Sequence, residues 1–313
     1  MLSYGCRRLA STLLVMAIVG VIVFLLLHLA PGSPAAIIAG DNATPAQIAE
    51  INHQLGLDRP LPVQFGFWAW NVLRGNFGTS IFSDTPVMQL IEQRLPATIS
   101  LTFVTIVFAA TTAVTAGLFA AWRAGGLLDR VLMGVAALGF SVPVFVVGYL
   151  LIYLFAIKLQ WLPVQGYVPL SRGFWPWFSH LILPALALGL AYLALIARIT
   201  RATVLEVLSE DYMRTARAKG ASSLRQLFHH ALRNAGVPIA TVIGIGIALL
   251  ISGVVLTETV FNIPGVGRLT VDAITNRDYP IIQGVMVVFS GAYVVINLLV
   301  DLSYTLIDPR IRR

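Results

Sequence analysis

Residues 235–257 read AGVPIATVIGIGIALLISGVVLT and contain no Asp, Glu, Lys or Arg. A membrane-spanning helix needs about 20 mostly apolar residues, so this stretch is long enough to be one span. Its Gly, Ala, Ser and Thr residues are typical of helices that pack closely in lipid. Five further uncharged windows bring the predicted number of spans to six: Leu9–Leu27, Leu95–Trp122, Val131–Ile157, Leu181–Ala197 and Tyr279–Val300.

The composition of the whole chain supports an integral membrane protein. Hydrophobic residues make up 58% of the 313 residues and charged residues 11%, against about 25% charged residues in soluble proteins. These values exclude a disordered chain, a disulfide scaffold and a water-soluble nucleic-acid-binding protein. Basic cytoplasmic loops explain the net charge of +7. The single cysteine, Cys6, cannot form an intrachain disulfide.

The windows divide the chain into three parts, and we expect an all-α membrane protein. Residues 1–30 are the N-terminal tail and first span, residues 31–94 an external segment with short helices, and residues 95–313 a core domain with five spans. The first window is longer than the core of a signal peptide, about 7–15 residues, so we expect an uncleaved span. Pro143 is expected to kink the third span, and Pro184 to open the fourth.

Basic residues predict the orientation of the spans, because cytoplasmic loops of membrane proteins are enriched in Lys and Arg. With both termini in the cytoplasm, 14 of the 21 Lys and Arg residues lie inside, on much the shorter total loop length. We therefore expect both termini to be cytoplasmic. The residues placed inside are Arg7, Arg8, Arg123, Arg130, Arg198, Arg201, Arg214, Arg217, Lys219, Arg225, Arg233, Arg310, Arg312 and Arg313.

The external segment contains residues that typically start and end short helices. Thr44-Pro45-Ala46-Gln47 predicts a helix start with a capping box, and Gly56 ends that helix. Asp84-Thr85-Pro86 is expected to start a helix that leads into the second span. Aromatic residues predict a further helix at the membrane surface: Phe65, Trp68 and Trp70. The segment either shields the mouth of the protein or docks a soluble external partner, and its composition does not favour one of these.

The chain lacks the motifs of an autonomous enzyme or pump. The only lysines, Lys158 and Lys219, do not follow a glycine, so there is no Walker A loop. The windows hold no ionisable residue of the kind that drives secondary transporters. Glu258 and Asp301 lie just past span ends, where solvation or a helix partner is the favoured interpretation. His229-His230 is a poor chelate, because adjacent helical residues point in different directions.

The cytoplasmic loop at 198–234 reads as a helix, a turn and a second helix. Ser209 is expected to cap the first helix, and Gly220 to end it in a left-handed conformation. Ser223-Leu224-Arg225-Gln226 matches a capping box for the second helix. The loop either rests as a basic amphipathic segment on anionic lipid or enters a groove of a partner protein. The two capped helices favour the partner.

This loop resembles that of a known family. Residues 214–220, RTARAKG, followed by residues 230–234, HALRN, and Pro238 are similar to the cytoplasmic loop of binding-protein-dependent ABC importer permeases. This sequence motif most resembles that of the B-type permease subunit of the dipeptide/oligopeptide/nickel family. Three more regions are similar to that subunit: LGLD at 55–58 and PL at 60–61 with GNFG at 75–78, ETVFNIPGVG at 258–267, and DLSY at 301–304 with DPRIR at 308–312.

The loop departs from the pattern of the broader permease superfamily, which reads Glu-Ala-Ala, two residues, then Gly. Thr215 stands in place of the Glu and Arg217 in place of the second Ala. Only Ala216 and Gly220 match the core pattern unchanged. A salt link from that Glu to the ATPase is therefore not expected here.

The resemblance implies a type I ABC importer permease with six transmembrane helices, in the bacterial inner membrane. It implies a second homologous permease subunit, two ATP-binding subunits at the cytoplasmic face, an external substrate-binding protein and membrane lipid as partners. ATP and Mg are expected on the ATPase subunits, and no cofactor, metal or catalytic residue in this chain. The residues expected in the ATPase-coupling loop are Tyr212, Arg214, Thr215, Ala216, Arg217, Ala218, Lys219, Gly220, His230 and Asn234.

The expected function is import driven by ATP, most commonly of di- or oligopeptides in this subfamily. Nickel complexes, glutathione and oligosaccharides stay open as substrates, and no substrate-binding residue is assigned. The alternative is a stand-alone secondary transporter or channel, which would need coupling residues of its own inside the membrane. A membrane-embedded enzyme would need a catalytic constellation in the spans, and the sequence shows none.

Overall fold

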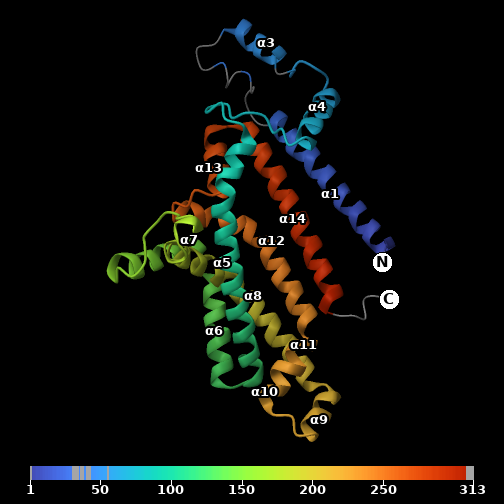
Figure 1. The fold of residues 1–313 in the computed structure, drawn as a ribbon, viewed down its shortest axis with the longest axis vertical. Coiled ribbons are helices and arrows are strands. Elements are labelled where there is room, and N and C mark those ends of the chain that lie inside the picture. The colour runs from blue at the N-terminus through green and yellow to red at the C-terminus, as the bar shows by residue number, and fades with distance from the viewer. Residues whose placement is uncertain (1, 30–34, 36–38, 40–43, 55, 308–313) are drawn as a thin grey trace. The chain divides into compact units, whose positions relative to one another are not determined.

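The computed structural model describes residues 2–29, 35, 39, 44–54 and 56–307, which form helices joined by turns and loops (Figure 1). These residues contain no strand beyond one isolated bridge between Thr79 and Pro86. The chain packs as two compact units, Met1–Leu95 with Leu269–Val294 and Pro96–Arg268 with Val295–Arg313. The division falls within three helices: α5 (Val87–Trp122), α13 (Val266–Asn276) and α14 (Tyr279–Ile307).

The first unit contains α1 (Leu2–Leu29), α3 (Pro45–Gln54) and α4 (Leu61–Leu73). The predicted capping box at the start of α3 is confirmed. The Thr44 N–H donates to Gln47 Oε1 at 2.8 Å, and the Gln47 N–H donates to Thr44 Oγ1 at 3.4 Å. Gly56 has a φ of +67° where the chain leaves this helix, as predicted.

Aromatic rings join α1 to α4 within this unit. The Phe24 ring lies 5.4 Å from that of Phe65 and 5.8 Å from that of Trp68, measured between centroids. Aromatic pairs in this range add about 0.5–1.5 kcal/mol beyond the area that they bury. The predicted helix at Phe65, Trp68 and Trp70 is therefore present as α4, and it packs on the first span.

The second unit is built around α5, α8 (Phe174–Ser209) and α12 (Gly236–Val260), with α6 (Leu127–Ser141) beside α5 (Figure 1). Where helices pack in lipid, close contact between side chains supplies the stability that the hydrophobic effect supplies in water. One hydrophobic cluster joins side chains of α5, α8 and α12 and of the segments next to them. Among its fully buried members are Leu101, Leu181, Leu188, Leu250 and Ile263.

The six predicted windows lie almost entirely in helices. Within the described residues, three single helices are long and apolar enough to span a membrane: α5, α8 and the Tyr279–Val300 part of α14. The bent pair of helices at 127–158 is a fourth when the pair is counted as one span. The first and fifth windows lie in α1 and α12, whose described apolar stretches are shorter, Thr12–Leu25 and Gly236–Ile247.

The third window is broken rather than kinked. Helix α6 and the segment Val144–Lys158, which is α7 (Val144–Leu151) followed by the π-helix η1 (Ile152–Lys158), meet at an angle of 104°. Pro143 removes one backbone donor, and its ring forces the residue before it out of the helical region. Val142 has φ −92° and ψ 128°, which is extended backbone. The expected kink at Pro143 is therefore a sharp change of direction.

The prediction that Pro184 opens the fourth span is wrong, because α8 begins ten residues earlier at Phe174. Pro184 lies inside this helix and is buried, as neighbouring helices can compensate a proline within a membrane. The prediction that residues 84–86 start a helix leading into the second span is confirmed. Helix α5 begins at Val87 and continues through Pro96 to Trp122.

The three parts expected from the sequence, 1–30, 31–94 and 95–313, stay a prediction. They describe membrane topology, whereas the two units describe packing.

Candidate functional site

In the loop between α8 and α12, the N-cap of the first helix lies one residue later than expected. Helix α9 (Asp211–Ala218) has Glu210 as its N-cap residue, and no side chain caps it. Ser209 is still helical, and its hydroxyl donates to the Glu206 carbonyl at 2.7 Å. The predicted Ser209 cap is therefore wrong: a serine in the last turn of a helix can satisfy its hydroxyl within that helix.

The end of α9 is the predicted turn. Gly220 has a φ of +82°, and its N–H donates to the Arg217 carbonyl at 3.0 Å. The Ala221 N–H donates to the Ala216 carbonyl at 3.1 Å, which closes the left-handed end of the helix. A side chain at position 220 would meet no atom within 4 Å. The need for glycine therefore comes from the backbone conformation and not from crowding.

The N-cap of the second helix of the loop is Ser222 rather than Ser223. The Ser222 side chain accepts from the Arg225 N–H at 3.4 Å, so it is the N-cap. Gln226 is buried, and its amide donates back to the Ala221 carbonyl at 2.7 Å. The helix then runs to Asn234 as α10 (Ser223–Arg225), the π-helix η3 (Gln226–Ala231) and α11 (Leu232–Asn234).

One face of the loop packs against α5 and α8 of the second unit. Leu227 and Ala231 are buried against Leu118 of α5 and against Val204 and Val207 of α8. Met213 of α9 is fully buried. Through η3, the loop is therefore part of a packed cluster that joins α5, α8 and the start of α12.

The opposite face consists largely of the residues predicted to contact an ATPase. Ala216 and His230 are half-buried. The other eight are exposed: Tyr212, Arg214, Thr215, Arg217, Ala218, Lys219, Gly220 and Asn234. The exposed face is thus basic and carries small side chains at its turn. The role of these ten residues stays a prediction.

No metal site is found among the described residues, where no three His, Cys, Asp or Glu side chains come together. The rings of His229 and His230 meet edge to face with their centroids 5.2 Å apart.

A buried ion pair near this loop was missed by sequence reasoning. Asp129 of α6 is 4% exposed and accepts from Arg201 of α8 through both carboxylate oxygens, each at 2.6 Å. The Gly125 N–H adds a third bond to Asp129 at 2.9 Å. A bidentate arginine–carboxylate pair fixes orientation as well as distance. This pair ties the turn between α5 and α6 to α8, about two turns before α8 ends at Ser209.

Glu258 is a helix partner, which confirms the structural interpretation. It is fully buried near the end of α12, where the Thr98 hydroxyl donates to it at 2.6 Å and the Arg268 N–H at 2.9 Å. The Val266 N–H donates in turn to the Thr98 hydroxyl at 2.8 Å. The carboxyl group therefore caps the N-terminus of α13, where the helix dipole favours negative charge. Asp301 lies in α14, but its side chain falls outside the described residues.

Gly265→Ala is expected to destabilise the protein, because the new Cβ would overlap the carboxyl group of Glu258. Losing a buried hydrogen bond to a charged group costs about 1.5–3 kcal/mol. The measurement is the midpoint of thermal unfolding in detergent. Gly134→Ala in α6 is the matched control, since a Cβ there meets nothing within 4 Å. Equal midpoints for the two variants would show that Glu258 does not hold this turn.

Comparison with known proteins identifies the chain. Residues 1–102 match the N-terminal region of the membrane components of binding-protein-dependent transport systems. Residues 113–313 match the family described as binding-protein-dependent transport system inner membrane component. The chain belongs to this family. It is a multi-pass membrane permease subunit of an ABC importer, and therefore a transport component and not an enzyme.

Two curated relatives cover nearly the whole permease. One from Sinorhizobium fredii, named a probable peptide ABC transporter permease protein, is 64% identical over 309 residues, or 99% of each chain. A glutathione transport system permease protein from Salmonella choleraesuis is 44% identical over 313 residues, or 100% of this chain and 99% of the relative. The resemblance inferred from the loop and the three other motifs is confirmed.

A solved structure shows the same fold. An inward-facing MetNI methionine ABC transporter structure matches with a TM-score of 0.60 and 16% identity, covering 71% of the permease and 97% of the solved chain. Identity this low supports the type I importer fold and nothing finer.

Proposed function

We propose that this permease is one of two homologous permease subunits in an importer of di- or oligopeptides in the bacterial inner membrane. An external binding protein delivers the peptide, and two ATPase subunits at the cytoplasmic face drive its passage. Family membership already implies the ATPases and the binding protein. The second permease subunit, the substrate class and the orientation are the proposed parts. The names of two relatives support the substrate class: one is named a peptide permease and the other a glutathione permease. Glutathione is itself a tripeptide.

The geometry of the loop between α8 and α12 carries the proposal of coupling. Its inner face is buried on α5 and α8, and its outer face presents Arg214, Arg217 and Lys219. Asp211 lies 3.4 Å from Arg214, but both are so exposed that this pair contributes little. The cations are thus available to a partner. ATP binding can shift the permease only through contacts that differ between its two states, and a small rigid helix in a cleft provides such contacts.

Transport by the assembled complex tests the proposed substrate class. Two permease subunits, the ATPase subunits and the cognate binding protein would be reconstituted in liposomes with labelled dipeptide, tripeptide, glutathione or nickel complex. We expect uptake of at least one peptide that requires both ATP and the binding protein. Uptake of the nickel complex alone would contradict the peptide assignment. Uptake by this chain without ATPase subunits would contradict the importer mechanism.

The orientation predicts a labelling pattern in intact cells. With Cys6 replaced, single cysteines at Gln47 and Arg74 should react with a thiol reagent that does not cross the membrane, whereas one at Ser222 should not. Gln47, Arg74 and Ser222 are all exposed on the chain, so their reactivity reports the side of the membrane. Labelling at Ser222 with silent external positions would reverse the assignment of the termini.

A further inference from the structure

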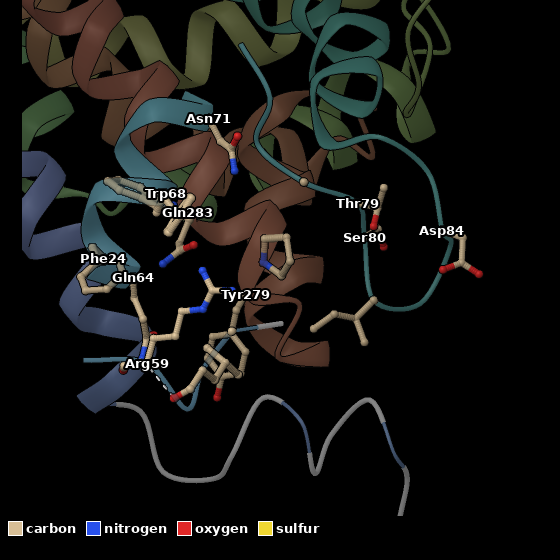
Figure 2. Close-up of a pocket in the computed structure, with 16 residues that line it drawn as sticks. Phe24, Arg59, Gln64, Trp68, Asn71, Thr79, Ser80, Asp84, Tyr279 and Gln283 are labelled. Carbon is tan, nitrogen blue, oxygen red and sulfur yellow. Dashed lines mark hydrogen bonds between the residues drawn. The ribbon is translucent and has the colours of Figure 1, made fainter. Parts of the chain in front are cut away.

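A cavity of about 610 Å³ lies within the first unit, bounded by α4, the residues before it, the loop at 78–84 and the start of α14 (Figure 2). Its volume falls in the range of protein binding sites, about 300–1,000 Å³. No part of the transport mechanism described above uses it. Figure 2 shows the side chain of Arg59 extending into the middle of the cavity, while the carboxylate of Asp84 points outward at its edge.

The frame of the cavity is held by hydrogen bonds that do not use the guanidinium group. The Gln64 amide donates to the carbonyls of Leu57 and Arg59, at 3.0 and 2.8 Å, and so holds the turn that carries Arg59. On the other side, the Ser80 hydroxyl donates to Asp278 at 2.5 Å, and both residues are buried. The site is therefore built before any ligand arrives, which lowers the entropic cost of binding.

Arg59 is a cation that the described part of the chain does not neutralise. Its guanidinium carbon lies 5.2 Å from the centroid of the Phe67 ring, and the residue is exposed. Stacking on a ring uses the face of the guanidinium and leaves its edge for hydrogen bonds. Among the described residues, the only ion pairs found are Asp129–Arg201 and Asp211–Arg214. A guanidinium presented in this way is suited to a carboxylate, which it can bind through two parallel hydrogen bonds.

We propose that this cavity receives an acidic side chain of the external binding protein, which pairs with Arg59. The inference rests on the proposed function and adds to it a docking site and its chemistry. A free small ligand would be mostly enclosed by its site, whereas Arg59 is exposed and Phe67 beside it is 56% exposed. An open site with an exposed arginine and an exposed aromatic wall suits a carboxylate carried on a larger protein surface.

The test compares Arg59→Gln, Arg59→Lys and the control Arg74→Gln in the full complex in nanodiscs. Arg74 also stacks on an aromatic ring, 4.4 Å from the Trp70 centroid, but does not line the cavity. We expect Arg59→Gln to raise the Kd of the binding protein about tenfold or more, and Arg74→Gln less than twofold. Arg59→Lys should fall between them, because it keeps the charge but loses the paired hydrogen bonds. Copurification of the ATPase subunits with each variant shows that the variant has folded.

The remaining outcomes separate this proposal from the proposed function. Binding-protein-stimulated transport by the wild type with equal Kd values for Arg59→Gln and Arg74→Gln would overturn the docking site alone. A lower peptide uptake at unchanged Kd would mean that Arg59 contacts the peptide, which also overturns the proposal. If Arg59→Gln weakens binding only in nanodiscs that contain anionic lipid, Arg59 binds lipid phosphate instead, and the proposal is overturned. No binding to the wild-type complex would contradict both proposals.

Discussion

Ala216→Asp is expected to abolish transport while the permease still inserts into the membrane. Ala216 is half-buried near the end of α9, and a proposed ATPase cleft around it has no room for a larger side chain that must also lose its water. An acid in the last turn of α9 costs only about 0.3–1 kcal/mol by itself, which is too little to unfold the protein. The measurement is peptide uptake together with the amount of copurified ATPase.

Position 220 gives a second variant at the same site. Gly220→Val forces a β-branched residue to a φ of +82°, at a cost of about 1–2 kcal/mol or more, and should also release the ATPase. Ser222→Ala removes a long N-cap hydrogen bond and should be mild. Ala202→Asp places the same acid on an exposed position of α8 and serves as the control. Full transport by Ala216→Asp with ATPase still bound would end the coupling role of this position.

If the loop merely rested on lipid, a different pattern would follow. Removing the charges of Arg225 and Arg233, which are both exposed, would then impair function more than Ala216→Asp. The two interpretations that the sequence left open are therefore separated by the same set of variants.

Arg201→Ala is expected to give the largest loss of stability. It leaves the buried Asp129 carboxylate with the Gly125 N–H as its remaining bond among those described. Breaking a buried pair from one side costs about 3–5 kcal/mol, and the lower end applies here because the Arg201 side chain is 29% exposed. We expect the midpoint of thermal unfolding to fall by about 5–10 °C.

Two further variants show whether the pair itself is responsible. Arg198→Ala removes an exposed arginine from the same helix, about one turn earlier, and should leave the midpoint unchanged. Asp129→Asn combined with Arg201→Gln leaves no buried charge, so this double variant should be more stable than Arg201→Ala alone. A midpoint for Arg201→Ala equal to that of Arg198→Ala would show that the pair does not hold α6 to α8.

Local signals explain which parts of the fold could be predicted. The capping box at Thr44 and Gln47 and the left-handed Gly220 depend on a few neighbouring residues, so the sequence alone reveals them. The N-cap at Ser222 was misplaced by one residue, because two adjacent serines offer equally good caps. Pro184 favours a helix start when the sequence is considered alone, because proline suits the first helical position. Packing inside the membrane overrides that preference in α8.

Long-range contacts explain what was missed. Asp129 and Arg201 are 72 positions apart, and each reads in isolation as a solvated charge at the end of a span. The sequence around Thr98 likewise does not indicate that this residue bridges Glu258 and the start of α13, which are 160 or more positions away. The residues of the predicted coupling loop are contiguous, so the sequence alone indicates them, whereas the Arg59 cavity collects residues from four separate segments.

Crosslinking between the loop and an ATPase subunit tests the central claim most directly. A permease with Cys6→Ser and Arg217→Cys would be assembled with its partners and treated with a short thiol-to-amine reagent, with Arg74→Cys as the external control. Both positions are exposed, so accessibility alone does not distinguish them. The account predicts a crosslinked permease–ATPase product from position 217 and none from position 74. No product from position 217, in a complex that still imports peptide, would contradict it.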